Sequence, residues 1–340
     1  MNRLFAMTVG GLFLLVLLTP GVVATFDGPL PVKNQFPLNL YLLSPRYESP
    51  RLEDSLTFNL AYSSIYMVRQ SKDYAVGIDL ESAELSIALK KVAFDSVELS
   101  AEVPVVVFTS GVMDDAINKY HETFGFADYG RRNRPLNSFL FSFQGNGKTL
   151  IDGKDGYIGL GDIRIGIKTP LLTSNPLVSV MFDLELPTGS SPRAGIGNGS
   201  IDAGCSLILS KELTSRLKSY AAVGVVFPGD YRGQEAIKLR SYLHGAAALQ
   251  YDLSRRFVLI GQLTAQGSAY PNTKIPQIDR TAVLLAIGAR YKLDNNTVEL
   301  SFTEDPSTSG AQDFSLNLMY KKERGGSAPL QNPLQVGQPP

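Results

Sequence analysis

Apolar and polar residues alternate along most of the chain, which is the pattern of β-strands. Between residues 176 and 187, Val178, Val180 and Phe182 fall on one face, whereas Asp183 and Glu185 fall on the other. A period of two positions is typical of a strand that separates two environments. Twelve segments have this pattern and are predicted as strands: 55–67, 74–90, 96–108, 157–169, 176–187, 200–210, 218–227, 239–252, 256–267, 280–292, 297–303 and 312–321.

The predicted strands are long for a soluble protein. Strands of soluble sheets commonly have about five or six residues, whereas tilted transmembrane strands need about 9 to 11. In most of the predicted strands one face is almost free of charge, and the opposite face carries charged or small residues. This asymmetry predicts an all-β fold, an antiparallel transmembrane β-barrel with a lipid-facing exterior and a wet interior. A secreted β-sandwich is the alternative, but it favours shorter strands.

The connections between predicted strands alternate in length, and the short ones are 170–175, 211–217, 254–256 and 294–296. Alternation of short and long connections matches periplasmic turns and extracellular loops, and it requires an even number of strands. If 109–156 is one large loop, the barrel has 12 strands and spans 55–321. If 138–145 is a strand, another is needed near 38–44, and the count becomes 14. We favour 12 strands.

The first 24 residues have the organisation of a secretory signal peptide. Arg3 precedes an apolar run from Leu4 to Leu18, Pro20 follows it, and Ala24 ends a cleavage site of small residues. We therefore predict a signal peptide over 1–24 and export to the outer membrane. Beyond it, no segment approaches the roughly 20 apolar residues of a transmembrane helix.

Three further segments do not fit the barrel wall. Residues 25–54 contain five prolines, too many for the interior of a sheet, and are either a periplasmic lead-in or a plug inside the lumen. Residues 322–340 are expected to be a disordered tail. Within loop 109–156, residues 112–124 are predicted as a short helix because their apolar residues recur with helical spacing. We expect this helix to fold inward as a constriction or lid; a cap over the barrel mouth is the alternative.

Charge patterning points to the lumen as the candidate site. Lys plus Arg and Asp plus Glu number 32 each, a balance that argues against a nucleic-acid partner. Charged residues on the inward faces would form either acidic and basic walls across a wet interior or ion pairs that fill a narrow barrel. The predicted lumen-lining residues are Glu98, Glu102, Asp162, Arg164, Lys168, Asp183, Glu185, Asp202, Arg240, His244, Asp252, Arg280, Arg290 and Lys292.

Candidate catalytic chemistry is sparse, because the chain has only two histidines, His121 and His244. On the predicted helix, Asp114, Asn118 and His121 share a face, with Asp115 beside them in the first turn. This spacing suits a metal ion or acid–base chemistry, but we favour the simpler interpretation, a solvated polar face on an amphipathic helix. A lipid hydrolase would need a serine near a histidine with an orienting acid or amide. We predict no catalytic residue, metal or cofactor, and keep a lipid-modifying enzyme as an alternative.

Several phrases, taken in order, resemble a family of uncharacterised bacterial outer-membrane β-barrel proteins. They are 34–37 (NQFP), 111–125 (GVMDDAINKYHETFG), 159–162 (GLGD), 186–189 (LPTG), 197–202 (GNGSID), 304–305 (ED) and 312–316 (QDFSL). The chain is also similar, more loosely, to barrels encoded with aromatic-degradation pathways. The resemblance implies one outer-membrane barrel with no assigned activity or ligand. One departure is the 20-residue tail after Tyr320, where such barrels commonly end at an aromatic residue.

These observations predict passive or gated passage of an unidentified small solute through the barrel, narrowed by the helix 112–124. The expected partners are outer-membrane lipids, the barrel assembly machinery and the solute. A non-transporting structural or surface-interaction barrel is the opposing hypothesis.

Overall fold

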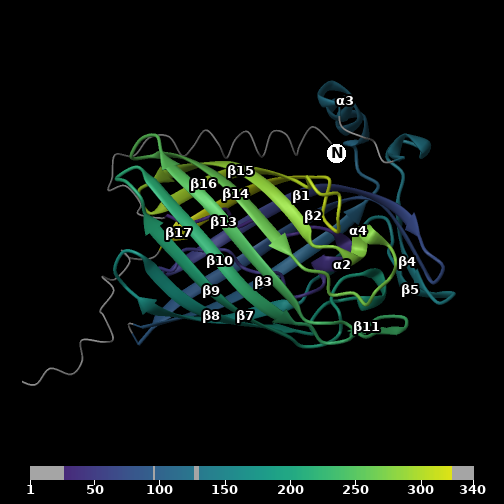
Figure 1. Ribbon diagram of the computed structural model, residues 1–340, viewed down its shortest axis with the longest axis horizontal. Helices are drawn as coiled ribbons and strands as arrows, with labels where there is room; N and C mark the ends of the chain where they lie inside the picture. Colours follow the sequence, from purple (N-terminus) through teal and green to yellow (C-terminus); the bar gives the residue numbers. More distant parts are fainter. Residues whose placement is uncertain (1–26, 95, 126–129, 324–340) are drawn as a thin grey trace, which may run out of the picture.

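The computed structural model describes residues 27–94, 96–125 and 130–323 and shows a closed antiparallel β-barrel (Figure 1). Strand β1 pairs with both β2 and β17, and β2 pairs with β3, so the wall closes on itself. The predicted 12-stranded barrel is confirmed. Its wall strands are β1 (Ser55–Gln70), β2 (Tyr74–Ala93), β3 (Val97–Thr109), β7 (Ile163–Leu172), β8 (Leu177–Leu186), β9 (Asp202–Glu212), β10 (Leu217–Phe227), β13 (Tyr242–Asp252), β14 (Phe257–Gln266), β15 (Ala282–Leu293), β16 (Asn296–Glu304) and β17 (Phe314–Glu323).

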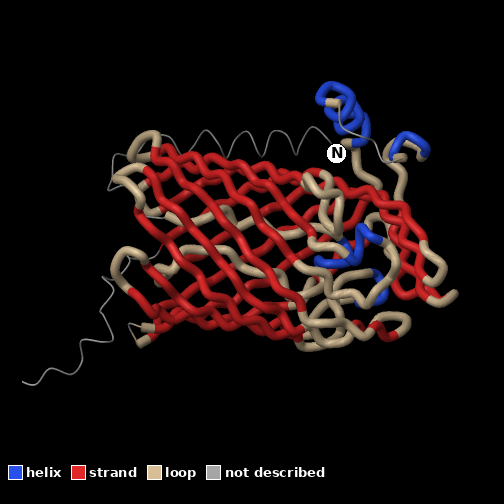
Figure 2. The backbone as a smooth tube through the Cα atoms, in the orientation of Figure 1, coloured by secondary structure: helices blue, strands red, loops and turns tan. Residues whose placement is uncertain are grey.

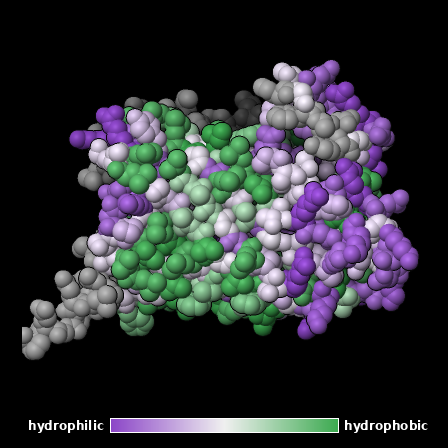
Figure 3. Space-filling model, viewed as in Figure 1, coloured by the Kyte–Doolittle hydropathy of each residue, from purple (hydrophilic) through white to green (hydrophobic). Residues whose placement is uncertain are grey.

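Each wall strand separates an apolar exterior from a polar interior. In β15, Leu285 and Ile287 are 44% and 60% exposed. Ala286, which lies between them, and Arg290, further along the strand, are buried. The exposed apolar side chains gather over the barrel wall (Figure 3). An apolar band of this kind is stable against lipid and costly against water, as expected for a transmembrane barrel.

The two ends of the barrel differ. At the end that we call the turn end, short connections such as 173–176 and 294–295 join the strands, and Ser55 of β1 pairs with Glu323 of β17. At the opposite end, which we call the loop end, the strands are joined by the longer connections 187–201, 228–241, 267–281 and 305–313. β17 extends two residues beyond the predicted barrel end at 321. The predicted signal peptide 1–24 and the tail from residue 324 lie outside the described residues.

Short strands extend the barrel at its loop end. The hairpin β4 (Leu140–Gly145) and β5 (Lys148–Asp152) continues from β2, and β6 (Tyr157–Leu160) pairs with β3. The 14-strand alternative is therefore wrong, because β4 pairs with the part of β2 beyond the wall and 38–44 contains the short helix α2 (Pro37–Leu40). The remaining short elements are η1 (Arg131–Asn133), η2 (Pro192–Ala194), β11 (Tyr231–Arg232), β12 (Ala236–Ile237) and α4 (Pro276–Asp279).

Helix α3 (Asp114–Phe124) forms where the sequence predicts a helix, and it ends at Gly125, whose φ of 73° is left-handed. It projects from the loop end away from the lumen (Figures 1 and 2). Our preferred placement of this helix as a constriction inside the barrel is therefore wrong. The physical reason is that another segment already fills the lumen. No helix of the described chain is long and apolar enough to cross a membrane.

Residues 27–54, which we call the plug, run through the lumen (Figure 2). Asp27 contacts Lys218 and Lys292 near the turn end, and α2 lies near the loop end, where Leu38 packs against the loops. The chain then returns, so that Asp54 contacts Lys91 near the turn end immediately before β1. The plug is thus a hairpin of irregular chain, with an outgoing limb, a turn at α2 and a returning limb.

Candidate functional site in the barrel lumen

Side chains of the wall supply hydrogen bonds to the plug backbone. The Leu30 amide donates to Gln262 Oε1 at 2.7 Å, and Gln262 Nε2 donates back to the Leu30 carbonyl at 3.2 Å. The Leu43 amide donates to Asp202 at 2.9 Å, and the Tyr242 hydroxyl donates to the Leu43 carbonyl at 2.9 Å. Buried backbone groups require partners, so these side chains replace the neighbouring strand that the plug lacks.

Two inward-facing glycines of the wall make room for plug side chains. A Cβ at Gly288 of β15 would lie 2.6 Å from Leu30 Cδ2, and one at Gly204 of β9 would lie 2.8 Å from Leu43 Cδ2. Both distances are too short for carbon atoms in contact, since the optimum is about 3.5 to 4.0 Å. Leu30 and Leu43 are almost fully buried. The wall is therefore shaped to receive the plug in one position.

A third glycine admits a charged plug residue. Arg46 reaches the wall over Gly166 of β7, where any Cβ would collide with the guanidinium group. There Arg46 Nη1 donates to Ser100 Oγ at 2.8 Å, and Nη2 forms an ion pair with Asp183. Ser100, Gly166 and Asp183 are cross-strand neighbours on β3, β7 and β8. The strand register thus assembles this binding point from three strands.

Most charges predicted to line the lumen do lie there, and they are paired. On the wall, Lys168 contacts Glu98 at 3.0 Å, and Arg164 contacts Glu185 at 3.3 Å. Glu102 forms an ion pair with Lys33 of the plug. This arrangement corresponds to the ion-pair alternative rather than to separate acidic and basic walls. The predicted residues found in the lumen are Glu98, Glu102, Arg164, Lys168, Asp183, Glu185, Asp202, His244, Arg290 and Lys292.

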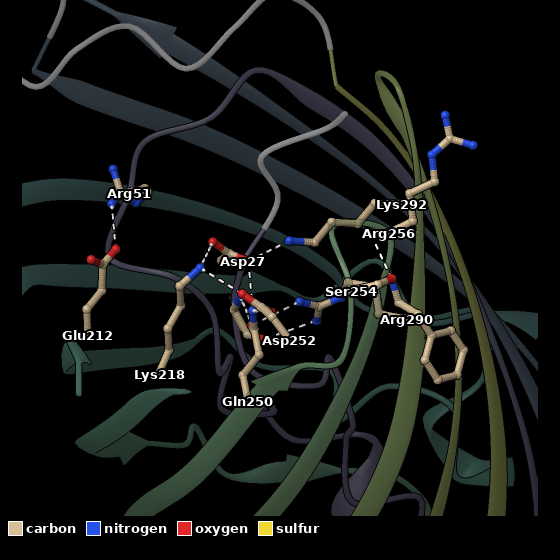
Figure 4. A network of polar contacts seen from close by, with 12 residues as sticks. Asp27, Arg51, Glu212, Lys218, Gln250, Asp252, Ser254, Arg256, Arg290 and Lys292 are labelled. Atoms are coloured by element: carbon tan, nitrogen blue, oxygen red, sulfur yellow. Dashed lines mark hydrogen bonds and ion pairs between the residues drawn. The ribbon is translucent and has the colours of Figure 1, made fainter. Parts of the chain in front are cut away.

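At the turn end, a polar network fixes the beginning of the plug (Figure 4). Asp27 accepts a hydrogen bond from Lys292 at 2.7 Å and forms an ion pair with Lys218. Gln250 Nε2 donates to Asp27 at 2.7 Å and to Asp252 at 2.9 Å, which places Asp252 at the rim of the lumen. A single plug carboxylate therefore links three wall strands.

The structure corrects two predicted lumen residues. Arg240 and Arg280 are exposed and lie in loops, because β13 begins at Tyr242 and β15 at Ala282. Arg240 Nε donates to the Ser268 carbonyl at 3.2 Å, outside the lumen. Asp162 lies between β6 and β7 and accepts hydrogen bonds from the backbone of loop 187–201. Arg240 and Arg280 continue the alternating pattern of β13 and β15 to positions before the first residue of each strand, so the pattern alone places them wrongly.

The loop end of the lumen is closed by an apolar core. Phe36, Leu38 and Leu42 of the plug are buried in it, and the Tyr270 hydroxyl donates to the Leu38 carbonyl at 2.7 Å. Phe143 and Tyr270 meet edge to face, with ring centroids 5.6 Å apart. Burying one such large apolar side chain is worth about 1.5–3 kcal/mol. The plug turn is consequently held mainly by apolar burial.

A serine and a histidine meet inside the lumen. Ser206 Oγ lies 3.2 Å from His244 Nε2, and Tyr47 of the plug packs against the imidazole with ring centroids 5.8 Å apart. Within the described chain, His244 Nδ1 has no hydrogen-bond partner. A hydrolytic triad needs a group that orients this nitrogen, so the pair lacks the third member. The described residues also contain no cluster of His, Cys, Asp and Glu suited to a metal ion.

The polar residues of α3 do not line the lumen. One of them, Asp114, connects the helix to the loops at the rim of the barrel. Asp114 contacts Arg131 at 2.7 Å, and Arg131 contacts Asp313 of the loop before β17 at 2.6 Å. Burial raises the pKa of Asp313 although Arg131 acts in the opposite direction. Asp115 is exposed and pairs with Lys119 one turn later. Asn118 and His121 lie further along this helix, outside the lumen.

Replacing Arg131 with Met should release α3 without opening the lumen. Asp114 and Asp313 would lose their shared cation, and removing one partner of a buried pair typically costs about 3–5 kcal/mol. We expect faster proteolysis in 110–139 and unchanged conductance in planar bilayers. Arg132→Met, at a half-exposed neighbour, is the matched control and should change neither. An increase in conductance for Arg131→Met would show that α3 does narrow the path.

Other charged residues that complete the lumen are not among those predicted from the sequence. Glu84, Lys90 and Glu299 lie on the inward faces of correctly predicted strands, so the alternation could have identified them. Lys33 and Arg46 belong to the plug, whose proline-rich sequence has no periodicity from which an orientation follows.

The fold and its occupied lumen define a transmembrane β-barrel of the outer-membrane type, closed by its own N-terminal segment. The chain belongs to the family described as protein of unknown function (DUF3187), whose model matches residues 11–323. This confirms the resemblance to uncharacterised outer-membrane barrels that the sequence indicated. No curated protein sequence matches the chain.

Several solved structures are similar in fold. The COG4313 outer membrane channel from Pseudomonas putida F1 is 13% identical over 84% of this chain and 98% of that chain, with a TM-score of 0.55. The NanC porin is 9% identical over 79% of this chain and 100% of that chain, with a TM-score of 0.46. The Pseudomonas putida toluene transporter TodX is 12% identical over 87% and 99% of the two chains, with a TM-score of 0.39. The first of these likenesses shows a shared barrel fold.

Proposed function

We propose that this protein is an outer-membrane channel for a small solute and that the structure represents its closed state. The observation that carries this proposal is the plug. Within the described residues 27–54, none belongs to a β-strand, and the strand pairing of β1 begins at Ser55. Withdrawal of the plug would therefore break side-chain contacts and leave the hydrogen-bond ladder of the wall intact.

The lumen would remain polar and keep charges of both signs after the plug leaves. Lys168–Glu98, Arg164–Glu185 and Arg290–Glu299 are pairs within the wall and do not depend on the plug. The plug residues Lys33, Arg46 and Glu53 pair with wall residues, and these contacts would be replaced by water. A lumen of opposite charges held in place suits the passage of small polar solutes.

The position of the barrel in the membrane follows from its apolar band and its two different ends. We infer that outer-membrane lipids cover the apolar band. We also infer that the turn end, where β1 begins and β17 ends, faces the periplasm. We also propose that the signal peptide predicted over 1–24 directs export and that the barrel assembly machinery inserts the protein into the outer membrane.

A disulfide between plug and wall should abolish conductance reversibly. The variant Leu30→Cys with Gly288→Cys, in a Cys205→Ser background, joins positions already in contact, and disulfides need Cβ atoms about 3.5–4.5 Å apart. We expect silence in planar bilayers when the protein is oxidised, and discrete conductance steps after dithiothreitol. Cys205→Ser alone should conduct equally in both states. Equal conductance of the oxidised and reduced double-cysteine variant would contradict a moving plug.

The opposing hypothesis is a barrel that carries nothing. It predicts no current from correctly folded protein under either condition, including after reduction of the disulfide. The same recordings therefore decide between the two functions.

A further inference from the structure

We propose that a cavity between the plug and the wall binds a small monocarboxylate, which names the class of solute for the proposed channel and rests on that function. The cavity has a volume of about 110 Å³ and lies between the plug and strands β1–β3, β7 and β17. An apolar cavity of about 150 Å³ accepts benzene. The space therefore suits a ligand of no more than about six non-hydrogen atoms, the number in benzene.

The buried guanidinium group of Arg164 supplies the main binding contact. Arg164 is 5% exposed and lines the cavity. Its Nη2 donates to Glu185 at 3.3 Å, whereas Nε and Nη1 have no hydrogen-bond acceptor within the described chain. Glu102 lies 3.8 Å from Nη1, beyond hydrogen-bond distance. Unmade hydrogen bonds of a buried charged group are costly, and a carboxylate can accept from two guanidinium nitrogens at once.

The side chains that line the cavity directly include more cations than carboxylates. Five cationic side chains line it, against three carboxylates, Glu48, Glu53 and Glu102. The cationic residues are Lys33, Arg46, Lys90, Arg164 and Lys321. Further carboxylates pair with these cations without lining the cavity: Glu84, Glu98, Asp183 and Glu185. With these four, seven carboxylates surround the five cations, so the surroundings disfavour a dianion, and the attraction for a monoanion comes from the unmade hydrogen bonds of Arg164.

One part of the remaining lining is suited to a short hydrocarbon chain, and it lies beside the polar residues Thr57, Asn59, Ser86 and Ser100. Pro29, Pro31, Val32, Ala88 and Met319 contribute to the cavity and offer few polar groups that an aliphatic tail would leave unpaired. An inorganic anion would satisfy Arg164 but leave this surface in contact with water. A carboxylate with a chain of a few carbons satisfies both parts.

The test is titration calorimetry of butyrate into the full-length mature protein in detergent micelles. We expect saturable binding of sodium butyrate and none of n-butanol, which has the same chain without the charge. Arg164→Met removes the proposed contact, and Ala88→Leu fills the cavity while every charge stays in place. Each should weaken butyrate binding at least tenfold. Arg280→Met, at an exposed loop arginine, is the matched control and should bind as the unmodified protein does.

The unmodified protein and each variant must first show the circular dichroism and the heat-dependent gel mobility of a folded barrel. Absence of saturable butyrate binding to folded unmodified protein would overturn the proposal, as would equal binding of butanol. Unchanged affinity in both Arg164→Met and Ala88→Leu would overturn it too. Calorimetry needs no current, so binding without conductance refutes the channel alone, and conductance without binding refutes the site alone.

Discussion

Deleting residues 27–50 should produce a barrel that conducts in large, discrete steps in planar bilayers. The deletion removes both limbs of the plug and its apolar turn but keeps Glu53, which forms an ion pair with Lys321. Side chains just fill the interior of a barrel of about eight strands. The interior of this wider wall would therefore hold a continuous column of water. We expect many-fold higher conductance than that of the intact protein, and it should persist at both polarities.

The matched control deletes 114–124, which removes the exposed helix α3 from the loop end. Because α3 lies outside the lumen, this deletion should leave the conductance of the intact protein unchanged. A folded barrel without its plug that stays silent would show that the wall or the loops close the path, and would refute the plug as the barrier.

Replacing Arg290 with Met should be the most destabilising single substitution in the lumen. Arg290 is fully buried, contacts Glu299 at 2.5 Å and donates to the Gly28 and Pro29 carbonyls at 3.0 and 3.4 Å. The substitution leaves a buried carboxylate without its cation and two plug carbonyls without a donor. We expect the free energy of unfolding to fall by about 3–5 kcal/mol, measured by guanidinium denaturation in detergent micelles.

The double variant Arg290→Met with Glu299→Gln should recover part of that loss, because the unpaired buried charge is then removed. Lys292→Met is the matched control, since Lys292 lies two residues further at the rim and Asp27 keeps Lys218 as a partner. A loss below about 1 kcal/mol for Arg290→Met would place this pair among ordinary exposed ion pairs. The same loss in the single and double variants would show that the plug contacts, rather than Glu299, set the cost.

The position of α3 shows where local pattern stopped being informative. Its sequence specifies a helix with an acidic first turn and a glycine stop, because helical spacing and capping are properties of neighbouring residues. Its location depends on Arg131, which lies 17 residues from Asp114, and on Asp313, which lies a further 182 residues along the chain. An apolar stripe on a helix favours packing against a surface such as the lumen, but the plug occupies that space.

The sequence by itself determined the barrel wall. A strand between lipid and a polar interior must alternate, so Leu285, Ile287 and Arg290 indicated both the strand and the direction of each side chain. Only the tertiary structure decided what occupies the interior. The plug has no regular secondary structure over most of its length, and its place is fixed by glycines such as Gly166 and Gly288, whose missing side chains give no signal until the opposing segment is known. Alternation arises locally, because each strand contacts lipid on one face and the polar lumen on the other. The fit of an irregular segment depends instead on contacts between residues far apart in the chain.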